Sequence, residues 1–300
     1  MTKKEYMIEK YDAYAKKYAE RRMDFFIDPS IARIDPFKIA DNVYYVGDKK
    51  VCIHLIDTGD GLILVDSGYL GAAHLLVDSI WRAGFDPRDI RIILHTHGHS
   101  DHFGASDAFK RIYGCKNAVS RVDAEYMRER YKDGTLGSKL YPLARLPEFD
   151  MEIEDGDVIE LGNVKIKCIL CPGHTEGVLS LFFDTTYEGK TYLVGLFGGV
   201  GTNALTLPYI YKNGYTEKLP YKMLDSIERL RKISVDIHLG NHPSNNHTLQ
   251  KRERQLTEGG NPFIDPSSWG ELLDSLEGTT KKIIEENDAL SKEAEALGYN

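Results

Sequence analysis

The stretch HTHGHSDHFG, residues 95–104, determines how the rest of the sequence is interpreted. It places four histidines and an aspartate within eight positions, directly after the apolar run 92–94. Imidazoles this close repel one another once protonated, and burying one without a partner is costly. A divalent ion removes both penalties, because it replaces repulsion between charged rings with coordination of neutral ones. We therefore interpret the stretch as a metal-binding loop rather than a solvated polar loop.

The loop supplies more donors than one ion needs. Its three imidazoles and one carboxylate are those of His97, His99, Asp101 and His102. Neutral imidazole and carboxylate are good zinc ligands, and four of them in one loop indicate two ions with further ligands from elsewhere. Two more histidines follow predicted strand ends: His174 in CPGHTEG and His242 in LGNHPS. Ligands at separate strand ends can converge at one edge of a pair of sheets.

The overall composition is that of an ordinary globular protein, and we expect its partner to be a small-molecule substrate. The 300 residues are 42% hydrophobic and 28% charged, with a net charge of −8. No run of Lys and Arg is long enough for a nucleic-acid surface, so we expect no nucleic-acid partner. The N-terminus lacks the apolar segment of a secretory signal and no window is long enough to span a membrane, which favours the cytoplasm. Four cysteines are too few for a disulfide framework, and Cys168 and Cys171 are interpreted as core residues.

Hydrophobic periodicity predicts two groups of strands with helices between and after them. Residues 1–26 and 267–297 read as helical, and residues 131–150 as a surface excursion over the site. The expected strands are 42–47, 51–58, 62–68, 90–95, 117–120, 157–161, 164–170, 178–183, 191–195 and 235–240. Two strand-rich halves, each with helices, predict two sheets packed together with helices outside.

The order of these motifs resembles the metallo-β-lactamase superfamily over roughly residues 37–290. The motif His-x-His-x-Asp-His is followed by Pro-Gly-His-Thr and then by a late histidine. The tail GGNPFIDP, residues 259–266, is similar to the third subclass of metallo-β-lactamases, whose zinc ligands are only His and Asp. The resemblance implies an αββα sandwich of two mixed sheets. It also implies a hydrolase domain, residues 37–300, after an N-terminal helical extension, residues 1–36.

The resemblance also implies a ligand for each position of a two-zinc site. His97, His99 and His174 would bind the first zinc, and Asp101, His102 and His242 the second. A hydroxide between the ions would attack a carbonyl, and Asp101 would act as the catalytic residue that orients it. Asp66, in LVDSG, would support the loop from beneath. For His95, a hydrogen bond to a ligand or carboxylate and a core position are both open.

The sequence leaves the substrate open among four classes. A cyclic amide of the β-lactam type comes first, and a lactone, ester or thioester is the alternative. A phosphodiester and a non-catalytic metal-binding module have less support. The loop 196–206, LFGGVGTNALT, lacks the paired serines that hold the substrate carboxylate in many members of the third subclass, and Thr202 or Asn203 could take that role. Residues 191–211 contain no Asp or Glu, so no carboxylate from that segment can bridge the two ions. The oligomeric state is also open.

Overall fold

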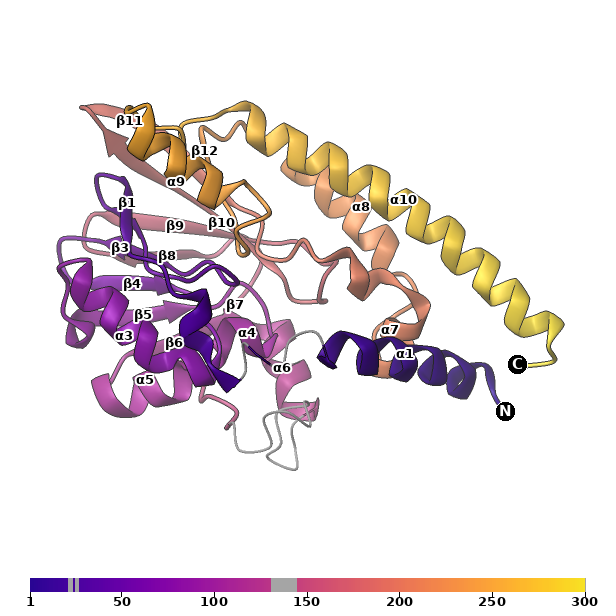
Figure 1. The fold of residues 1–300 in the computed structure, drawn as a ribbon. Coiled ribbons are helices and arrows are strands. Elements are labelled where there is room, and N and C mark those ends of the chain that lie inside the picture. The colour runs from indigo at the N-terminus through magenta and orange to yellow at the C-terminus, as the bar shows by residue number, and fades with distance from the viewer. Residues whose placement is uncertain (21–23, 25–26, 131–144, 300) are drawn as a thin grey trace.

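The computed structural model describes residues 1–20, 24, 27–130 and 145–299, and two mixed β-sheets form its centre (Figure 1). The first sheet has the order β1-β2-β3-β4-β5-β6-β7, and the second has the order β12-β11-β10-β9-β8. The strands of the first sheet are β1 (Phe37–Ala40), β2 (Val43–Tyr45), β3 (His54–Asp57), β4 (Leu62–Val65), β5 (Ile90–Leu94), β6 (Lys116–Ser120) and β7 (Met151–Ile153). Those of the second are β8 (Val158–Leu161), β9 (Val164–Leu170), β10 (Leu179–Tyr187), β11 (Lys190–Leu196) and β12 (Ile237–Leu239).

Helices lie outside both sheets, and the helices near the two termini extend beyond them (Figure 1). Those used below are α1 (Lys3–Glu20), α3 (Ala73–Arg82), α4 (Ser100–Phe103), α5 (Ser106–Tyr113), α6 (Arg121–Arg130), α7 (Leu207–Asn213), α8 (Leu219–Leu230), α9 (Thr248–Thr257) and α10 (Ser267–Ala296). Helices α3 and α5 pack on the first sheet, and α8 and α10 pack on the second. The predicted αββα sandwich is therefore confirmed.

Strand β4 shows why the central strands are apolar on both faces. Ile63 and Val65 point into the core between the sheets, which also contains Leu181 of the second sheet. Leu62 and Leu64 point the other way, into the layer under α3 and α5. Successive side chains alternate between faces, so a strand covered on both sides must be apolar at every position.

The strand directions bring the histidine-bearing loops to one edge. Strands β4, β5, β6 and β7 are parallel, so their carboxyl ends lie together. The histidine-rich loop leaves β5, and Asp66 follows β4 directly. In the second sheet, β11 and β12 are also parallel, and β9 and β12 end just before the loops that carry His174 and His242. Parallel sheets present functional loops at this edge.

The structure also differs from the sequence prediction in several elements. The sequence predicted residues 95–104 as loop throughout, but Ser100–Phe103 form a short helix, α4, so His102 lies on a helix. Strands β1 and β7 and helix α7 were not predicted. Most of the expected surface excursion, 131–144, lies outside the described residues.

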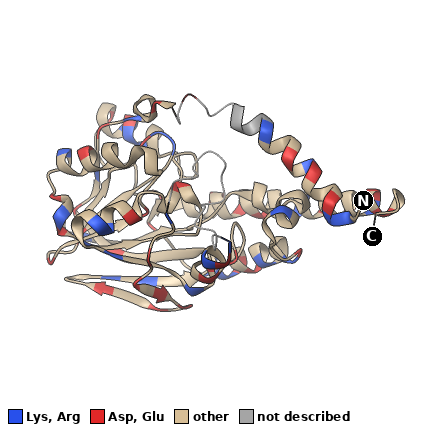
Figure 2. Cartoon of the chain, turned by 90° about the horizontal axis from the view of Figure 1, so that it is seen from below, with Lys and Arg blue, Asp and Glu red and all other residues tan. Residues whose placement is uncertain are grey.

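Helix α1 lies beside α7, near the C-terminal end of α10 (Figure 1). Met7 of α1 is fully buried in a cluster with Leu207 and Ala294. Acidic and basic residues are interspersed along α1 (Figure 2). Among the described residues, no helix is both long and apolar enough to cross a membrane. All four cysteines are free and buried, as predicted for core residues.

Candidate metal centre

The first candidate ligand set consists of His97, His99 and His174. Nε2 of His97 lies 3.2 Å from Nδ1 of His99, and that atom lies 2.9 Å from Nε2 of His174. Zinc–nitrogen bonds of about 2.0–2.1 Å in a tetrahedron place two ligand nitrogens about 3.3 Å apart. The spacing of this set is therefore close to that of three ligands of one zinc ion.

The outer ring nitrogens of the first set show which atoms face inward. His97 donates its Nδ1–H to the carbonyl of Gly198 at 2.7 Å, and His174 donates its Nδ1–H to the carbonyl of Gly201 at 2.6 Å. A carbonyl can only accept, so each ring keeps its proton on the outer nitrogen and presents a lone pair inward. Such outer partners fix the tautomer and orientation of ligand histidines.

The glycine-rich loop after β11 can approach the histidines because it has no side chains there. A Cβ on Gly201 would lie 2.5 Å from the ring of His174, and one on Gly198 would lie 2.0 Å from the carbonyl of Leu179. In the structure these glycines let the backbone approach the histidines.

The second set consists of Asp101, His102 and His242. One carboxylate oxygen of Asp101 lies 3.6 Å from Nε2 of each histidine. The outer Nδ1 of His102 donates to Asp66 at 2.7 Å, and that of His242 donates to the carbonyl of Lys50 at 2.7 Å. Within the described part of the chain, the buried Nε2 of His102 has no hydrogen-bond partner. An unpartnered buried acceptor between a carboxylate and another imidazole fits a cation-binding role.

The protonation states of the first set and of Asp101 also fit metal binding. Burial lowers the pKa of His99 to about 4, and burial together with the neighbouring imidazoles lowers the pKa values of His97 and His174 well below the usual range. Neutral imidazole is the form that coordinates. Burial opposes ionisation of Asp101, but His102 and His242 outweigh it and hold its pKa below the usual range. The six side chains form two groups whose donor atoms each lie within 4.8 Å of one another.

Asp66 lies beneath the loop, at the end of β4. It accepts hydrogen bonds from the backbone N–H and the hydroxyl of Thr96, both at 2.8 Å, as well as the one from His102. Its φ of +63° is a left-handed conformation that costs a non-glycine residue of order 1 kcal/mol or more. Three hydrogen bonds to one buried carboxylate explain why this conformation persists.

Asp123, which the sequence did not single out, connects two ligand loops. This fully buried side chain of α6 accepts from the backbone N–H of Gly98 at 2.7 Å, the hydroxyl of Thr175 at 2.8 Å and the N–H of Gly177 at 3.0 Å. Gly98 lies between His97 and His99 in the chain, and Thr175 follows His174. Asp123 therefore joins both loops that supply the first set.

The remaining predicted residues lie around the two sets. Thr202 and Asn203 follow Gly201 in the short helix Thr202–Leu205. Thr202 is partly buried and Asn203 is exposed. Their role toward a substrate stays a prediction. His95 is buried and its Nε2 pairs with the hydroxyl of Ser106 at 3.1 Å. The ring also interacts with the side chain of Asn117 and the backbone of His102, so both alternatives for His95 stay predictions.

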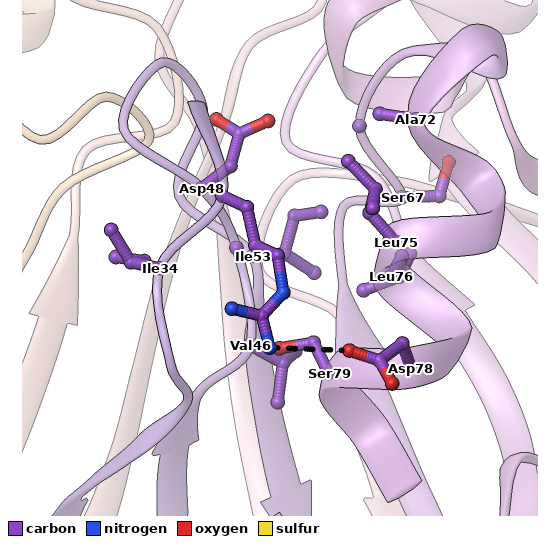
Figure 3. A pocket seen from close by; sticks show the side chains of 13 residues that line it. Ile34, Val46, Asp48, Ile53, Ser67, Ala72, Leu75, Leu76, Asp78 and Ser79 are labelled. Carbon is purple, nitrogen blue, oxygen red and sulfur yellow. Dashed lines mark ion pairs between the residues drawn. The ribbon is translucent and has the colours of Figure 1, made fainter. Parts of the chain in front are cut away.

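None of the six side chains lines the pocket shown in Figure 3. It lies between α3 and the loop after β2, and Val46, Ile53 and Leu76 line it. An ion pair between Arg33 and Asp78, 3.5 Å apart, lies across it (Figure 3). The pocket is separate from the metal centre.

With this geometry in place, comparison with known proteins gives the family. The family model "Metallo-beta-lactamase superfamily" matches residues 46–278. The chain belongs to this superfamily. Family membership and the shared fold make it a metallo-hydrolase.

Solved and curated members of the superfamily resemble the chain over different lengths. A subclass B3 metallo-beta-lactamase of Bradyrhizobium japonicum is 25% identical, with a TM-score of 0.77, over 88% of this chain and 98% of that one. A probable metallo-hydrolase of Methanocaldococcus jannaschii is 28% identical over 52% of this chain and 68% of its own length. An N-acyl homoserine lactonase of Bacillus thuringiensis is 25% identical over 61% of this chain and 76% of its own length.

Proposed function

We propose that the chain is a zinc-dependent hydrolase that opens cyclic amides of the β-lactam type. The main support for this proposal is the composition of the two ligand sets, which contain five histidines and one aspartate. The segment after β11, residues 197–211, contains no carboxylate that could join them. The similarity in fold to subclass B3 metallo-beta-lactamases over most of the chain supports this ligand set.

Some residues of the chain would hold the zinc ions, and Asp101 would also orient the attacking oxygen. His97, His99 and His174 would hold one zinc, and Asp101, His102 and His242 would hold the other. When bound, zinc supplies a Lewis acid for the carbonyl and makes hydroxide available near neutral pH. Asp101 is the one ionised carboxylate in the two sets, and its side chain is 21% exposed. It would accept a hydrogen bond from the attacking oxygen and so orient a lone pair toward the carbonyl carbon.

A lactone is the second candidate, because a specific similarity favours it. The Bacillus thuringiensis relative, 25% identical over 215 residues, is named as an N-acyl homoserine lactonase. Cyclic esters and cyclic amides present the same carbonyl to the same attacking group, and the fold does not choose between them. Phosphodiesters have less support, because the net charge is −8 and acidic residues accompany basic ones on the helices (Figure 2).

A parallel turnover assay tests the proposal. Zinc-loaded protein is given a chromogenic cephalosporin, N-acyl homoserine lactones, a thioester and a phosphodiester, and kcat/KM is measured for each. We expect the lactam to give the highest value and Asp101→Asn to abolish its turnover. A higher value for the lactone would make the second candidate the function. Turnover of the phosphodiester far above every carbonyl substrate would overturn both.

A further inference from the structure

His99 differs from the other histidines of the two sets in what holds its outer nitrogen. Its Nδ1 faces His97 and His174, so the proton lies on Nε2, which donates to the hydroxyl oxygen of Tyr209 at 3.1 Å. The other four rings donate to backbone carbonyls or to Asp66. Only His99 therefore depends, among these five, on a side chain of the seven-residue helix α7.

The ring of Tyr209 is held by other aromatic rings. Tyr215 stacks against it, with ring centroids 6.3 Å apart and planes at 12°. On another side the ring of Tyr11, from α1, meets it edge-on at 5.6 Å and 79°. Stacked and edge-on aromatic pairs are favourable geometries that restrict the position of the ring between them. Tyr209 thus links the N-terminal helix to a ligand of the first set.

Further contacts fix α1 against α7. Lys212 of α7 pairs with Asp12 of α1 at 2.7 Å, one residue beyond Tyr11. Met7, one turn before Tyr11, is fully buried with Leu207. Figure 1 shows the two helices side by side, which places the N-terminal segment against the element that carries Tyr209. The contact is continuous along α1 and not confined to one ring.

We propose that α1 belongs to the framework of the metal centre: Tyr11 positions Tyr209, and Tyr209 positions the ring of His99. The inference rests on the proposed function only in treating His97, His99 and His174 as zinc ligands. Both tyrosines are positioning residues, and loss of an outer partner of a ligand histidine costs about 10–100-fold in metal affinity. The N-terminal extension then sets the zinc affinity of the first set, from outside the part of the chain that the family model matches.

The test isolates the first set and measures zinc affinity without substrate. In full-length protein carrying His242→Ala, zinc affinity is measured by competition with a chromophoric chelator. Tyr209→Phe keeps the ring and removes the hydroxyl, and we expect about 10-fold weaker binding. Tyr11→Leu removes the ring edge and should weaken binding by a smaller factor. Tyr11→Phe keeps the ring and should leave the affinity unchanged.

Tyr14→Ala is the matched control on the same helix, because the Tyr14 side chain is 54% exposed, and it should also leave the affinity unchanged. Unchanged binding in Tyr209→Phe would overturn the link to His99. Weakened binding in Tyr209→Phe with full affinity in Tyr11→Leu would overturn the role of α1. Thermal unfolding identifies any variant that fails to fold, and Tyr11→Met then replaces Tyr11→Leu. A protein that behaves as expected here but hydrolyses neither lactam nor lactone would overturn the proposed function alone.

Discussion

The two ligand sets lie side by side but are held in different ways. The rings of His97 and His102, one from each set, have centroids 4.2 Å apart. In the first set, backbone carbonyls hold two neutral imidazoles and Asp123 joins the loops. In the second, a carboxylate belongs to the set and that of Asp66 supports His102. The first set therefore depends on loop geometry, whereas the second depends on negative charge.

Removal of a ligand should have the largest effect. We expect His97→Ala and His174→Ala to lose the first zinc and to abolish hydrolysis, because each removes an inward lone pair that nothing else replaces. The loss should exceed the 10–100-fold that removal of an outer partner produces. Metal analysis and kcat measure it. His74→Ala is the control, because His74 is exposed on α3, and equal damage there would contradict the ligand assignment.

The second set contains a carboxylate and the first contains only imidazoles, so we expect the two sets to bind zinc with different affinities. Among the described residues no carboxylate joins the two sets, so each ion would have its own ligands and the two need not leave together. Chelator titration of the two-zinc protein should show two steps. Asp101→Asn removes the charge of the second set and should abolish one step while keeping the other. A single unresolvable step in the wild type would mean that the sets act as one site.

Asp66 and Asp123 are buried aspartates that support different ligand sets, so replacing each one tests whether the two sets are held independently. Asp66→Asn should weaken the second set by about 10–100-fold, because His102 loses its anionic partner. Asp123→Asn should weaken the first, because an amide cannot accept from Gly98, Thr175 and Gly177 together. Chelator competition assigns each change to a step. If both variants weakened the same step, the two sets would not have separate supports.

The fold and the six candidate ligands could be predicted from the sequence, whereas the groups that hold the ligands in place could not. The sandwich was predictable because its strands are apolar on both faces, and the six donors were predictable because they lie in short motifs. Asp123 lies three residues after Ser120, a spacing typical of a helix capping box, although its carboxylate turns to the ligand loops instead. Tyr209 lies 110 positions from His99, so no local pattern connects them. The carbonyls of Gly198 and Gly201 carry no side-chain signal at all.

Replacement of His95 should have the smallest effect on metal binding. His95 is as buried as Asp66 and begins the histidine-rich loop, residues 95–104. Its ring pairs with the hydroxyl of Ser106, which lies 2.9 Å from that of Ser67. Among the described residues it also interacts with the backbone of His102, but with no ring of either set. His95→Gln should therefore leave both zinc steps at wild-type affinity. Replacing a buried, hydrogen-bonded ring should still lower the free energy of unfolding by about 1–3 kcal/mol. Denaturant unfolding and chelator competition on one preparation measure the two quantities. His95→Gln could instead lower the zinc affinity of one step as much as Asp66→Asn does. A buried side chain beneath the loop would then support the metal centre without a hydrogen bond to a ligand ring.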